Sequence, residues 1–242
     1  MRIRPLFFQA VSAFCAFTIL CGLGFWQVER KAWKESLIAA VNERIAAAPA
    51  PLPAPRDWPR LAPETYEFRR VTVRLQFPQN ATAFVFTGGS SLRSDIKAPG
   101  YFVFAPARIP SGETIVVNLG FAPDKTIPDI AGTREITGFL RWPERPNWFV
   151  DEHDSAGETW FVRDHEAIAT FLKWGTVAPF YIDQESPVPP GGIPKPGPIA
   201  VRFPNNHFGY ALTWFGLAAA LAGVFGIWLR RQVRGRQISR SL

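Results

Sequence analysis

Residues 6–26 read LFFQAVSAFCAFTILCGLGFW, a run of 21 residues without a charged side chain. A second uncharged run of 22 residues, FGYALTWFGLAAALAGVFGIWL, occupies residues 208–229. As an α-helix, each run is about 30 Å long, which matches the hydrocarbon core of a bilayer. A buried core helix of a soluble protein is the alternative, but both runs have the length of a membrane span and adjoin basic chain ends. The sequence therefore predicts two transmembrane helices, over residues 6–27 and 208–229.

The composition of the second run indicates how that helix would pack. Gly216, Gly223 and Gly226 are small residues of the kind that let helices approach closely in lipid. Aromatic residues suited to the membrane–water interface lie near the ends of the two runs: Trp26, Tyr210, Trp214 and Trp228. We therefore expect close helix packing at these glycines, with aromatic belts at both membrane surfaces.

The residues after the first run distinguish a cleaved signal peptide from an uncleaved anchor. No cleavage site of small residues follows promptly. Instead, Leu37, Val41 and Ile45 recur at four-residue steps, which predicts that one helix leaves the membrane and continues until Pro49 stops it. We interpret residues 28–63 as a helical extension followed by a proline-rich linker, behind an uncleaved anchor.

The charges are distributed unevenly along the chain. Of the 27 Lys and Arg, seven lie at the extreme ends, where there is no acid, and residues 29–202 hold the other 20 together with all 20 Asp and Glu. The high isoelectric point therefore describes the tails and gives no support to a nucleic-acid-binding domain. Two Cys are too few for a disulfide scaffold or a Cys-rich zinc site.

The same basic residues orient the two helices. Five Arg follow Leu229, whereas only Lys195 and Arg202 lie in the fifteen residues before the second run. This imbalance predicts that both chain ends, residues 1–5 and 230–242, are cytoplasmic and that the segment between the helices is outside the cytoplasm. Because few residues precede the first run, we expect a bacterial inner membrane and a periplasmic domain rather than an organelle.

Prolines cluster on both sides of that central segment. Six lie within residues 49–63 and seven within residues 187–204. Proline-rich segments form extended, semi-rigid spacers without ladder hydrogen bonds. We therefore expect the second cluster to belong to a linker over residues 187–207, and the two clusters to bound a periplasmic domain of residues 64–186.

The residues of this domain are typical of short strands. Apolar and polar residues alternate over residues 71–77, as in a half-buried strand. Further short runs predict six more strands: 83–87, 101–105, 114–118, 135–141, 159–162 and 179–182. One helix is expected, with Asp164 as its N-cap and Ile168, Phe171 and Leu172 on one face. The predicted fold class is a membrane protein whose two helices flank an α+β domain, an antiparallel sheet or small barrel.

Few residues in the domain carry recognisable chemistry. The sequence contains no P-loop, dinucleotide fingerprint, Gly-x-Ser-x-Gly elbow or HExxH motif. His153 and His165, with acids around them, could bind a metal, although a polar loop and a helix start are the simpler interpretation. Cys15 and Cys21 would lie on different faces of one helix, as packing residues. Four tryptophans could form a binding surface, with aromatic packing as the default: Trp142, Trp148, Trp160 and Trp174.

His207, at the mouth of the second run, is the strongest candidate for a ligand. Tyr210, Ala211 and Trp214 follow it at i+3, i+4 and i+7, so one helix face would carry aromatic rings beneath the imidazole. An axial nitrogen beside an apolar, aromatic wall suits a haem iron. The alternative is an interfacial His that bonds to lipid headgroups. As an iron ligand, His207 would have Tyr210 and Trp214 against the haem and an asparagine of residues 205–206 orienting the imidazole.

Five short motifs occur in order along the chain: residues 23–34, 99–106, 117–123, 138–144 and 206–215. In these motifs the sequence resembles the surfeit locus protein 1 family of cytochrome c oxidase assembly factors, whose members have two transmembrane helices around an extramembrane domain. The resemblance runs nearly end to end. It departs at Leu119, where the family usually has Arg, so a charged contact at that position is not expected here.

The resemblance implies that the chain helps to mature a haem–copper oxidase by assisting insertion of haem a into the catalytic subunit. It implies that His207 matches the second-helix histidine of the family. The implied partners are the oxidase catalytic subunit, the haem a synthesis machinery and the lipid bilayer, with no nucleic acid. No enzymatic turnover is implied, and the sequence offers no convincing nucleophile–base set. The alternative is a cofactor-free periplasmic scaffold that stabilises an oxidase subunit.

Overall fold

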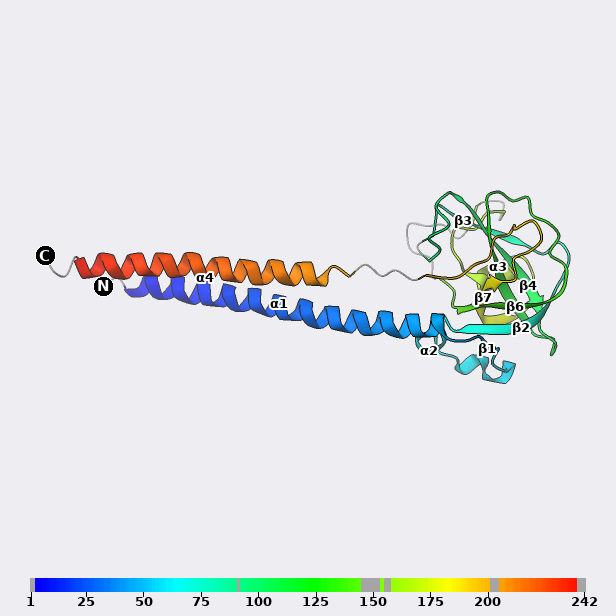
Figure 1. The fold of residues 1–242 in the computed structure, drawn as a ribbon, viewed down its shortest axis with the longest axis horizontal. Helices are drawn as coiled ribbons and strands as arrows, with labels where there is room; N and C mark the ends of the chain where they lie inside the picture. The colour runs from blue at the N-terminus through cyan, green and yellow to red at the C-terminus, as the bar shows by residue number, and fades with distance from the viewer. Residues whose placement is uncertain (1–2, 91, 145–152, 155–157, 201–204, 239–242) are drawn as a thin grey trace. The chain divides into compact units, whose positions relative to one another are not determined.

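The computed structural model describes residues 3–90, 92–144, 153–154, 158–200 and 205–238. The chain divides into two compact units (Figure 1). The first, which we call the helical unit, comprises Met1–Ala39 and Phe203–Leu242. The second, the barrel unit, comprises Ala40–Arg202. Both proline-rich stretches therefore belong largely to the barrel unit.

Two long helices make up the helical unit. Helix α1 spans Ile3–Ala46 and helix α4 spans His207–Ile238. Both are long and apolar enough to cross a membrane, and only 6% of the most apolar stretch of each is buried. A core helix of a soluble protein would be mostly buried, so its apolar side chains would not face outward in this way. The prediction that α1 continues beyond its apolar run and ends just before Pro49 is confirmed.

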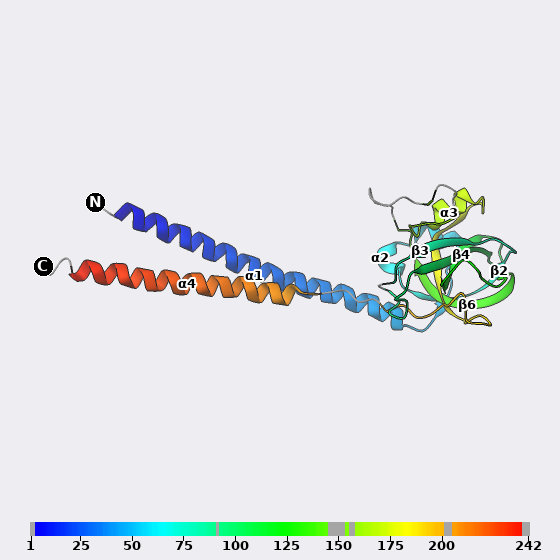
Figure 2. The same ribbon diagram turned by 90° about the horizontal axis from the view of Figure 1, so that it is seen from above.

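Helices α1 and α4 lie nearest each other where α4 begins and diverge toward the chain ends (Figures 1 and 2). Among the buried and half-buried residues of α4, one set recurs at steps of four and three: His207, Ala211, Trp214, Ala218, Leu221, Phe225 and Trp228. In α1 the corresponding positions near the start of α4 are Leu20, Gly24, Gln27 and Lys31. A mean step of 3.5 residues is typical of helices that coil around each other. We call these two sets of positions the seam.

Close packing occurs at a different glycine from those that the sequence indicated. A Cβ added at Gly216, Gly223 or Gly226 would meet no heavy atom within 4 Å, so the prediction of close packing there is wrong. Gly216 and Gly223 are exposed because they lie off the seam. The close approach is at Gly24 of α1, where a Cβ would lie 2.6 Å from the ring of Phe215.

The barrel unit is built on a seven-stranded sheet in the order β1-β2-β6-β7-β5-β4-β3, in which an additional β2–β4 pairing closes a five-stranded barrel (Figures 1 and 2). The strands are β1 (Ala50–Pro51), β2 (Arg70–Phe77), β3 (Ala83–Thr87), β4 (Gly100–Arg108), β5 (Thr114–Ala122), β6 (Gly132–Arg141) and β7 (Val177–Ser186). The core inside is apolar, and Leu75, Ile115 and Leu140 are fully buried there. Two apolar helices around a β-rich domain, as predicted, are thus confirmed, and of the two alternatives for that domain the barrel is the one observed.

Two features of the sheet depart from the predictions. The run 159–162 does not form a strand, because Trp160 alone pairs with the edge strand β3. Its N–H donates to the Phe84 carbonyl at 2.8 Å and its carbonyl accepts from the Phe86 N–H at 2.7 Å. The sheet is also not wholly antiparallel, since β7 pairs in parallel with β5 and β1 with β2.

The proline-rich stretches are folded parts of the barrel unit, so the prediction of extended spacers without ladder hydrogen bonds is wrong for both. The first contains β1, a 3-10 helix η1 (Pro55–Arg60) and α2 (Pro63–Tyr66). Within η1, Trp58 is buried and its indole N–H donates to the Pro53 carbonyl at 2.9 Å. In the second, Lys195 exchanges two backbone hydrogen bonds with Phe121. Proline lacks only its own N–H, so the residues between the prolines can still form backbone hydrogen bonds and bury their side chains.

The predicted helix in the domain is α3, His165–Phe171. The Asp164 carboxylate caps it by accepting from the N–H groups of Glu166 and Ala167, as expected. Ile168 is fully buried, and Phe171, although 47% exposed, packs its ring against the buried Trp160. The helix ends at Phe171, whose ring packs at its edge against Trp160 and His153.

Candidate functional site

His207 is the first residue of α4 and occupies a seam position. Its ring is half-buried, and Nδ1 donates a hydrogen bond to Oε1 of Gln27 in α1 at 2.7 Å. Among the residues that the structure describes, none forms a hydrogen bond with His207 Nε2. The asparagines of residues 205–206, predicted to orient the imidazole, do not contact it through a hydrogen bond within the described chain; Gln27 takes that place.

The aromatic residues after His207 differ in their accessibility. Tyr210 is 57% exposed beside the seam, whereas Trp214 occupies a seam position and is half-buried. Ala211 is only 3% exposed because it lies in the seam itself, against α1. The helix face that was predicted to carry aromatic rings is therefore covered by α1 at Ala211. A flat apolar ligand near His207 would meet Tyr210 and Trp214.

The other side of the site is built from α1. Gly24 admits the ring of Phe215, and Phe25 contacts the same ring edge-to-face with centroids 5.3 Å apart. Such aromatic pairs add about 0.5–1.5 kcal/mol beyond area burial. One turn above, Gln27 is 9% exposed and meets His207. Gly24, Phe25 and Gln27 thus hold α4 at a fixed register beside α1.

Basic residues follow Gln27 along α1. Lys31, one turn further on the seam, pairs with Glu35 at 2.7 Å. The guanidinium of Arg30 lies 3.9 Å from the centroid of the Trp33 ring, a cation–π contact. The imidazole of His207 therefore lies between an apolar helix pair and a positively charged turn of α1.

The residues present fit an iron-bound macrocycle. An amide oxygen can only accept, so Gln27 fixes the hydrogen on Nδ1 and leaves the lone pair on Nε2. Histidines that bind metals commonly donate their other ring N–H to such an acceptor. The aromatic faces of Tyr210 and Trp214 supply the apolar contact. Haem is therefore a chemically suitable ligand for this end of α4.

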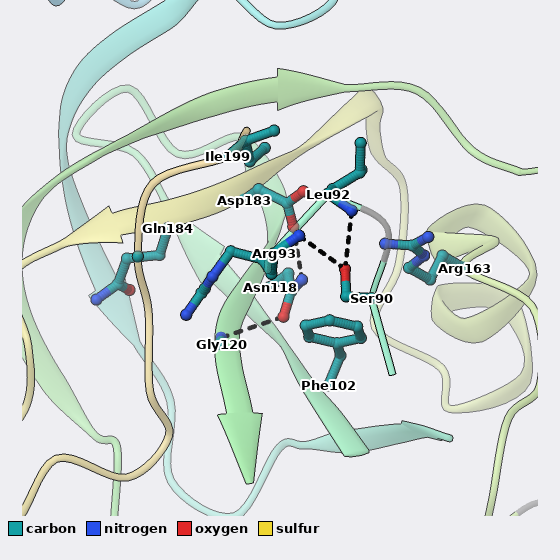
Figure 3. Close-up of a pocket in the computed structure, with 11 residues that line it drawn as sticks. Ser90, Leu92, Arg93, Phe102, Asn118, Gly120, Arg163, Asp183, Gln184 and Ile199 are labelled. Atoms are coloured by element: carbon teal, nitrogen blue, oxygen red, sulfur yellow. Dashed lines mark hydrogen bonds between the residues drawn. The ribbon is translucent and has the colours of Figure 1, made fainter. Parts of the chain in front are cut away.

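A second polar site lies on the outer face of β5, β6 and β7, opposite the apolar interior, where Arg141 is 5% exposed. Its guanidinium contacts Asp183 at 3.0 Å and Glu67 at 3.2 Å. Burial alone would lower the pKa of Arg141, but the neighbouring Tyr181, Asp183 and Glu67 raise it above its ordinary value. Asn118 donates to the other oxygen of Asp183 (Figure 3). The buried charge of Arg141 is thus paired with two carboxylates, which offset the cost of removing it from water.

The cavity beside this network is small, about 20 Å³, which is room for about one water molecule. Figure 3 shows its polar lining, which includes Ser90, Arg93, Asn118, Arg163 and Asp183. A haem or nucleotide needs hundreds of cubic ångströms. This cavity is therefore too small for a cofactor of that size, and the network beside it is a buried polar cluster.

The remaining candidates do not assemble a site within the described residues. His165 is fully buried and its Nε2 donates to the Ala178 carbonyl at 2.9 Å, while His153 packs on Trp160. No group of three His, Cys, Asp or Glu in the described part of the chain could hold a metal ion; the acids at 151–152 lie outside it. Cys15 and Cys21 are unpaired thiols.

The predicted tryptophan surface divides in a similar way. Trp160 is buried, and Trp142 and Trp174 are partly buried against the two cores of the barrel unit. Trp148 lies outside the described residues. The three tryptophans that the structure describes pack as core aromatics, which was the default interpretation.

The five sequence motifs gather in two places. Residues 23–34 and 206–215 meet where Gln27 contacts His207, whereas residues 99–106, 117–123 and 138–144 lie on β4, β5 and β6 of the barrel. A sequence profile of the SURF1 family matches residues 14–219, which includes all five motifs. The chain belongs to the SURF1 family. Its membership confirms the resemblance and, with it, the coarse functional class, an assembly factor of cytochrome c oxidase.

Curated relatives support the same assignment over most of the chain. Surfeit locus protein 1 of Rattus norvegicus is 33% identical over 232 residues, which cover 88% of this chain and 72% of the relative. The Homo sapiens protein of the same name is 33% identical over 235 residues, covering 88% and 74%. A SURF1-like protein of Monosiga brevicollis is 31% identical over 230 residues, covering 87% and 83%.

Sequence reasoning placed Gln27 in a motif without assigning it a role. Gln27 and His207 are 180 positions apart, so no local pattern joins them. A signal was nevertheless present, because Gly24, Gln27 and Lys31 follow the seven-residue repeat of a helix seam. An uncharged polar residue at such a position is unusual unless it has a partner across the seam.

Proposed function

We propose that this SURF1 family member is anchored in a bacterial inner membrane and assists insertion of haem a into the catalytic subunit of cytochrome c oxidase. Haem a is then the cargo, held transiently through His207. What supports this function is the geometry of that residue: Nδ1 is bonded to Gln27, and Nε2 has no partner among the described residues.

The chain's own residues would divide the work of holding the cargo. His207 would offer its Nε2 lone pair as a ligand to the haem iron. Tyr210 and Trp214 cover one face of the macrocycle with apolar rings. Gly24 lets α4 approach α1, so that the His207 ring is held by the seam. One histidine and a half-open wall suit release to another protein better than permanent binding.

The membrane orientation follows from the charges at the end of α4. Arg230, Arg231 and Arg234 come directly after the apolar run, and they favour the cytoplasmic side. The barrel unit is then periplasmic, and the N-terminus of α4, with His207, lies near the periplasmic surface. The proposed partners of this surface are the oxidase catalytic subunit and the machinery that makes haem a.

A cofactor-free scaffold is the second candidate, and exposed aromatic residues at the barrel edge favour it. Phe86 of β3 and Phe161 are each 42% exposed, and their rings contact each other at 6.4 Å between centroids. β3 ends the sheet but its backbone is paired with Trp160, so a partner would contact the exposed rings of Phe86 and Phe161 through its side chains. A subunit docked there would be stabilised without any haem.

Replacement of His207 by Ala separates the two functions. The protein is purified in detergent from cells that make haem a, and its visible spectrum is measured against protein concentration. Because the iron–nitrogen bond is lost and the rings remain, we expect weak, spectrally altered haem binding with unchanged protein yield. A Tyr210→Phe control, which keeps the ring, should retain the wild-type spectrum.

A His207→Ala protein with the full wild-type spectrum would eliminate His207 as ligand. Absence of haem from the wild-type protein would leave the scaffold as the function. In that case Phe86→Asp should reduce oxidase assembly in cells, whereas His207→Ala should not.

A further inference from the structure

Gln27 is buried in a place where an amide side chain has a cost. It is 9% exposed, in a seam whose other nearby positions include Gly24, Ala211 and Ala218. A polar group removed from water is tolerated when it is hydrogen-bonded. The bond to His207 supplies that partner, across two helices that are far apart in the sequence.

The identity of the Gln27 atom decides which nitrogen of His207 is free. Oε1 faces Nδ1 at 2.7 Å, and a carbonyl oxygen has lone pairs but no hydrogen. Nδ1 must therefore carry the hydrogen, and Nε2 presents its lone pair. The ring plane is fixed as well, because the bond is short and both residues occupy the seam.

We propose that Gln27 is the positioning residue of the haem site: it sets the tautomer and the orientation of His207 so that Nε2 is the iron ligand. This inference rests on the proposed function for its haem part, since Gln27 acts through His207 and not on the iron. Because Gln27 lies on α1 and His207 on α4, the ligand is correctly oriented only when the two helices are paired. Haem affinity is thereby coupled to closure of the helix pair.

The chemical nature of the acceptor at position 27 would also change how strongly Nε2 of His207 donates electrons to the iron. An acceptor on the outer ring nitrogen raises the electron-donating power of the nitrogen that binds metal. A carboxylate at position 27 accepts more strongly than an amide, and an alkyl side chain does not accept at all. Gln27→Glu and Gln27→Leu therefore change the iron ligand in opposite directions while keeping a side chain of similar size.

The first test needs no haem. The full chain is prepared in detergent with 15N-labelled histidine, and the ring nitrogens are recorded by NMR, with the His207→Ala spectrum used to assign one of the three histidines. We expect Nδ1 of His207 to carry the hydrogen in the wild type and in Gln27→Glu. In Gln27→Leu the hydrogen should be shared between the two nitrogens.

The second test loads the same proteins with haem a. Removal of such an orienting partner typically weakens metal binding 10- to 100-fold, and we expect that loss in Gln27→Leu. Gln27→Glu should retain affinity, with a shifted Soret band and a lower reduction potential. Gln9→Leu, at an exposed glutamine of the same helix, is the matched control and should change neither quantity.

The outcomes separate this inference from the proposed function. A hydrogen on Nε2 in the wild type, or a Gln27→Leu protein with wild-type affinity and spectrum, would overturn the role of Gln27 while haem binding by His207 stands. A wild type that binds no haem would overturn the haem site altogether. If Gln27→Leu merely unfolds the helix pair, the helical circular dichroism of that protein should fall. The Gln27→Glu protein, which keeps an acceptor at this position, should retain both the wild-type circular dichroism and haem binding.

Discussion

His165 and His207 show how one residue type is used in two different ways in this protein. His165 is fully buried at the start of α3, and its Nε2 donates to the Ala178 carbonyl at 2.9 Å. Burial lowers its pKa below the ordinary value of 6.5, although the bond to Ala178 and the nearby Asp164 oppose the shift. In both residues the other ring nitrogen has no hydrogen-bond partner among the described residues, but that of His165 is buried, whereas His207 is only half-buried at the start of α4. The first is a structural residue and the second a candidate ligand.

The lowered pKa of His165 predicts that the barrel unit loses stability in mild acid. Below pH 6.5 the unfolded chain binds a proton that the native His165 resists, so the free energy of unfolding falls as the pH drops toward the native pKa. His165→Asn should be less stable at pH 7.5 but should lose less stability between pH 7.5 and 5.5. The measurement is denaturant unfolding of the full chain in detergent, followed by tryptophan fluorescence. Equal pH slopes in the two proteins would refute the assignment.

Residues of the proposed site could be predicted from sequence only where a motif or helix repeat contains them. His207, Tyr210 and Trp214 share one helix, so their spacing indicates a common region. The contact of Gln27 with His207 depends on how two distant helices pair, and no local spacing encodes it. The burial of Ala211 against α1 likewise follows from this pairing and not from local spacing.

At the scale of elements, the pairing of α1 with α4 depends on Gly24. A Cβ at this position would lie 2.6 Å from the Phe215 ring, which cannot move freely because Phe25 packs against it. Gly24→Ala should destabilise the helix pair by about 1–3 kcal/mol, the usual cost of overpacking. The measurement is the loss of a disulfide cross-link between cysteines introduced on α1 and α4.

Gly22 provides the matched control on the same helix. A Cβ there would meet nothing within 4 Å, so Gly22→Ala should leave the cross-link unchanged or strengthen it slightly. Phe215→Leu in the Gly24→Ala background should recover part of the loss, because the smaller side chain relieves the overlap. Equal effects of Ala at positions 22 and 24 would show that the seam does not require a glycine.

Elements with a strong period were predictable, and those that depend on neighbours were not. Residues 70–77 alternate as a strand because one face of β2 is buried in the barrel. Residues 159–162 are equally apolar, yet only Trp160 finds a strand edge to pair with. The proline clusters were misread because composition does not show that Trp58 and Ile199 are buried among them.

At the scale of the whole molecule, the proposed topology predicts which loops face the periplasm. Cys15 and Cys21 are first replaced by Ala, and one cysteine is then introduced, either at Ser111 or at Asp124. Both positions lie on exposed turns of the barrel unit. Both should react with a membrane-impermeant reagent in intact spheroplasts, since the arginines after α4 favour a cytoplasmic tail.

A cysteine at position 237 is the counterpart and should react only after lysis. Labelling of this position in intact spheroplasts, with protection of the other two, would reverse the orientation and remove the periplasmic contact with the oxidase. The protein without any cysteine controls for non-specific reaction.

The class of the barrel was predictable but its strand order was not. Short strands separated by turns indicate a small barrel, whereas the position of β7 between β6 and β5 reflects long-range pairing. The parallel contact of β5 with β7 joins residues more than sixty positions apart, such as Val116 and Tyr181. No periodicity within either strand distinguishes this arrangement from an antiparallel meander.

The position of β7 also governs how the protein is made. Synthesis proceeds from the N-terminus, so β2 to β6 all emerge before the strand that joins β5 to β6. Until Ser186 has left the ribosome, those two strands present unpaired backbone groups to every other chain nearby. The nascent barrel is therefore an open sheet for most of its synthesis, tethered by α1 alone, and it closes shortly before α4 is translated. A chain released early is a candidate for chaperones and proteases rather than a partly active protein.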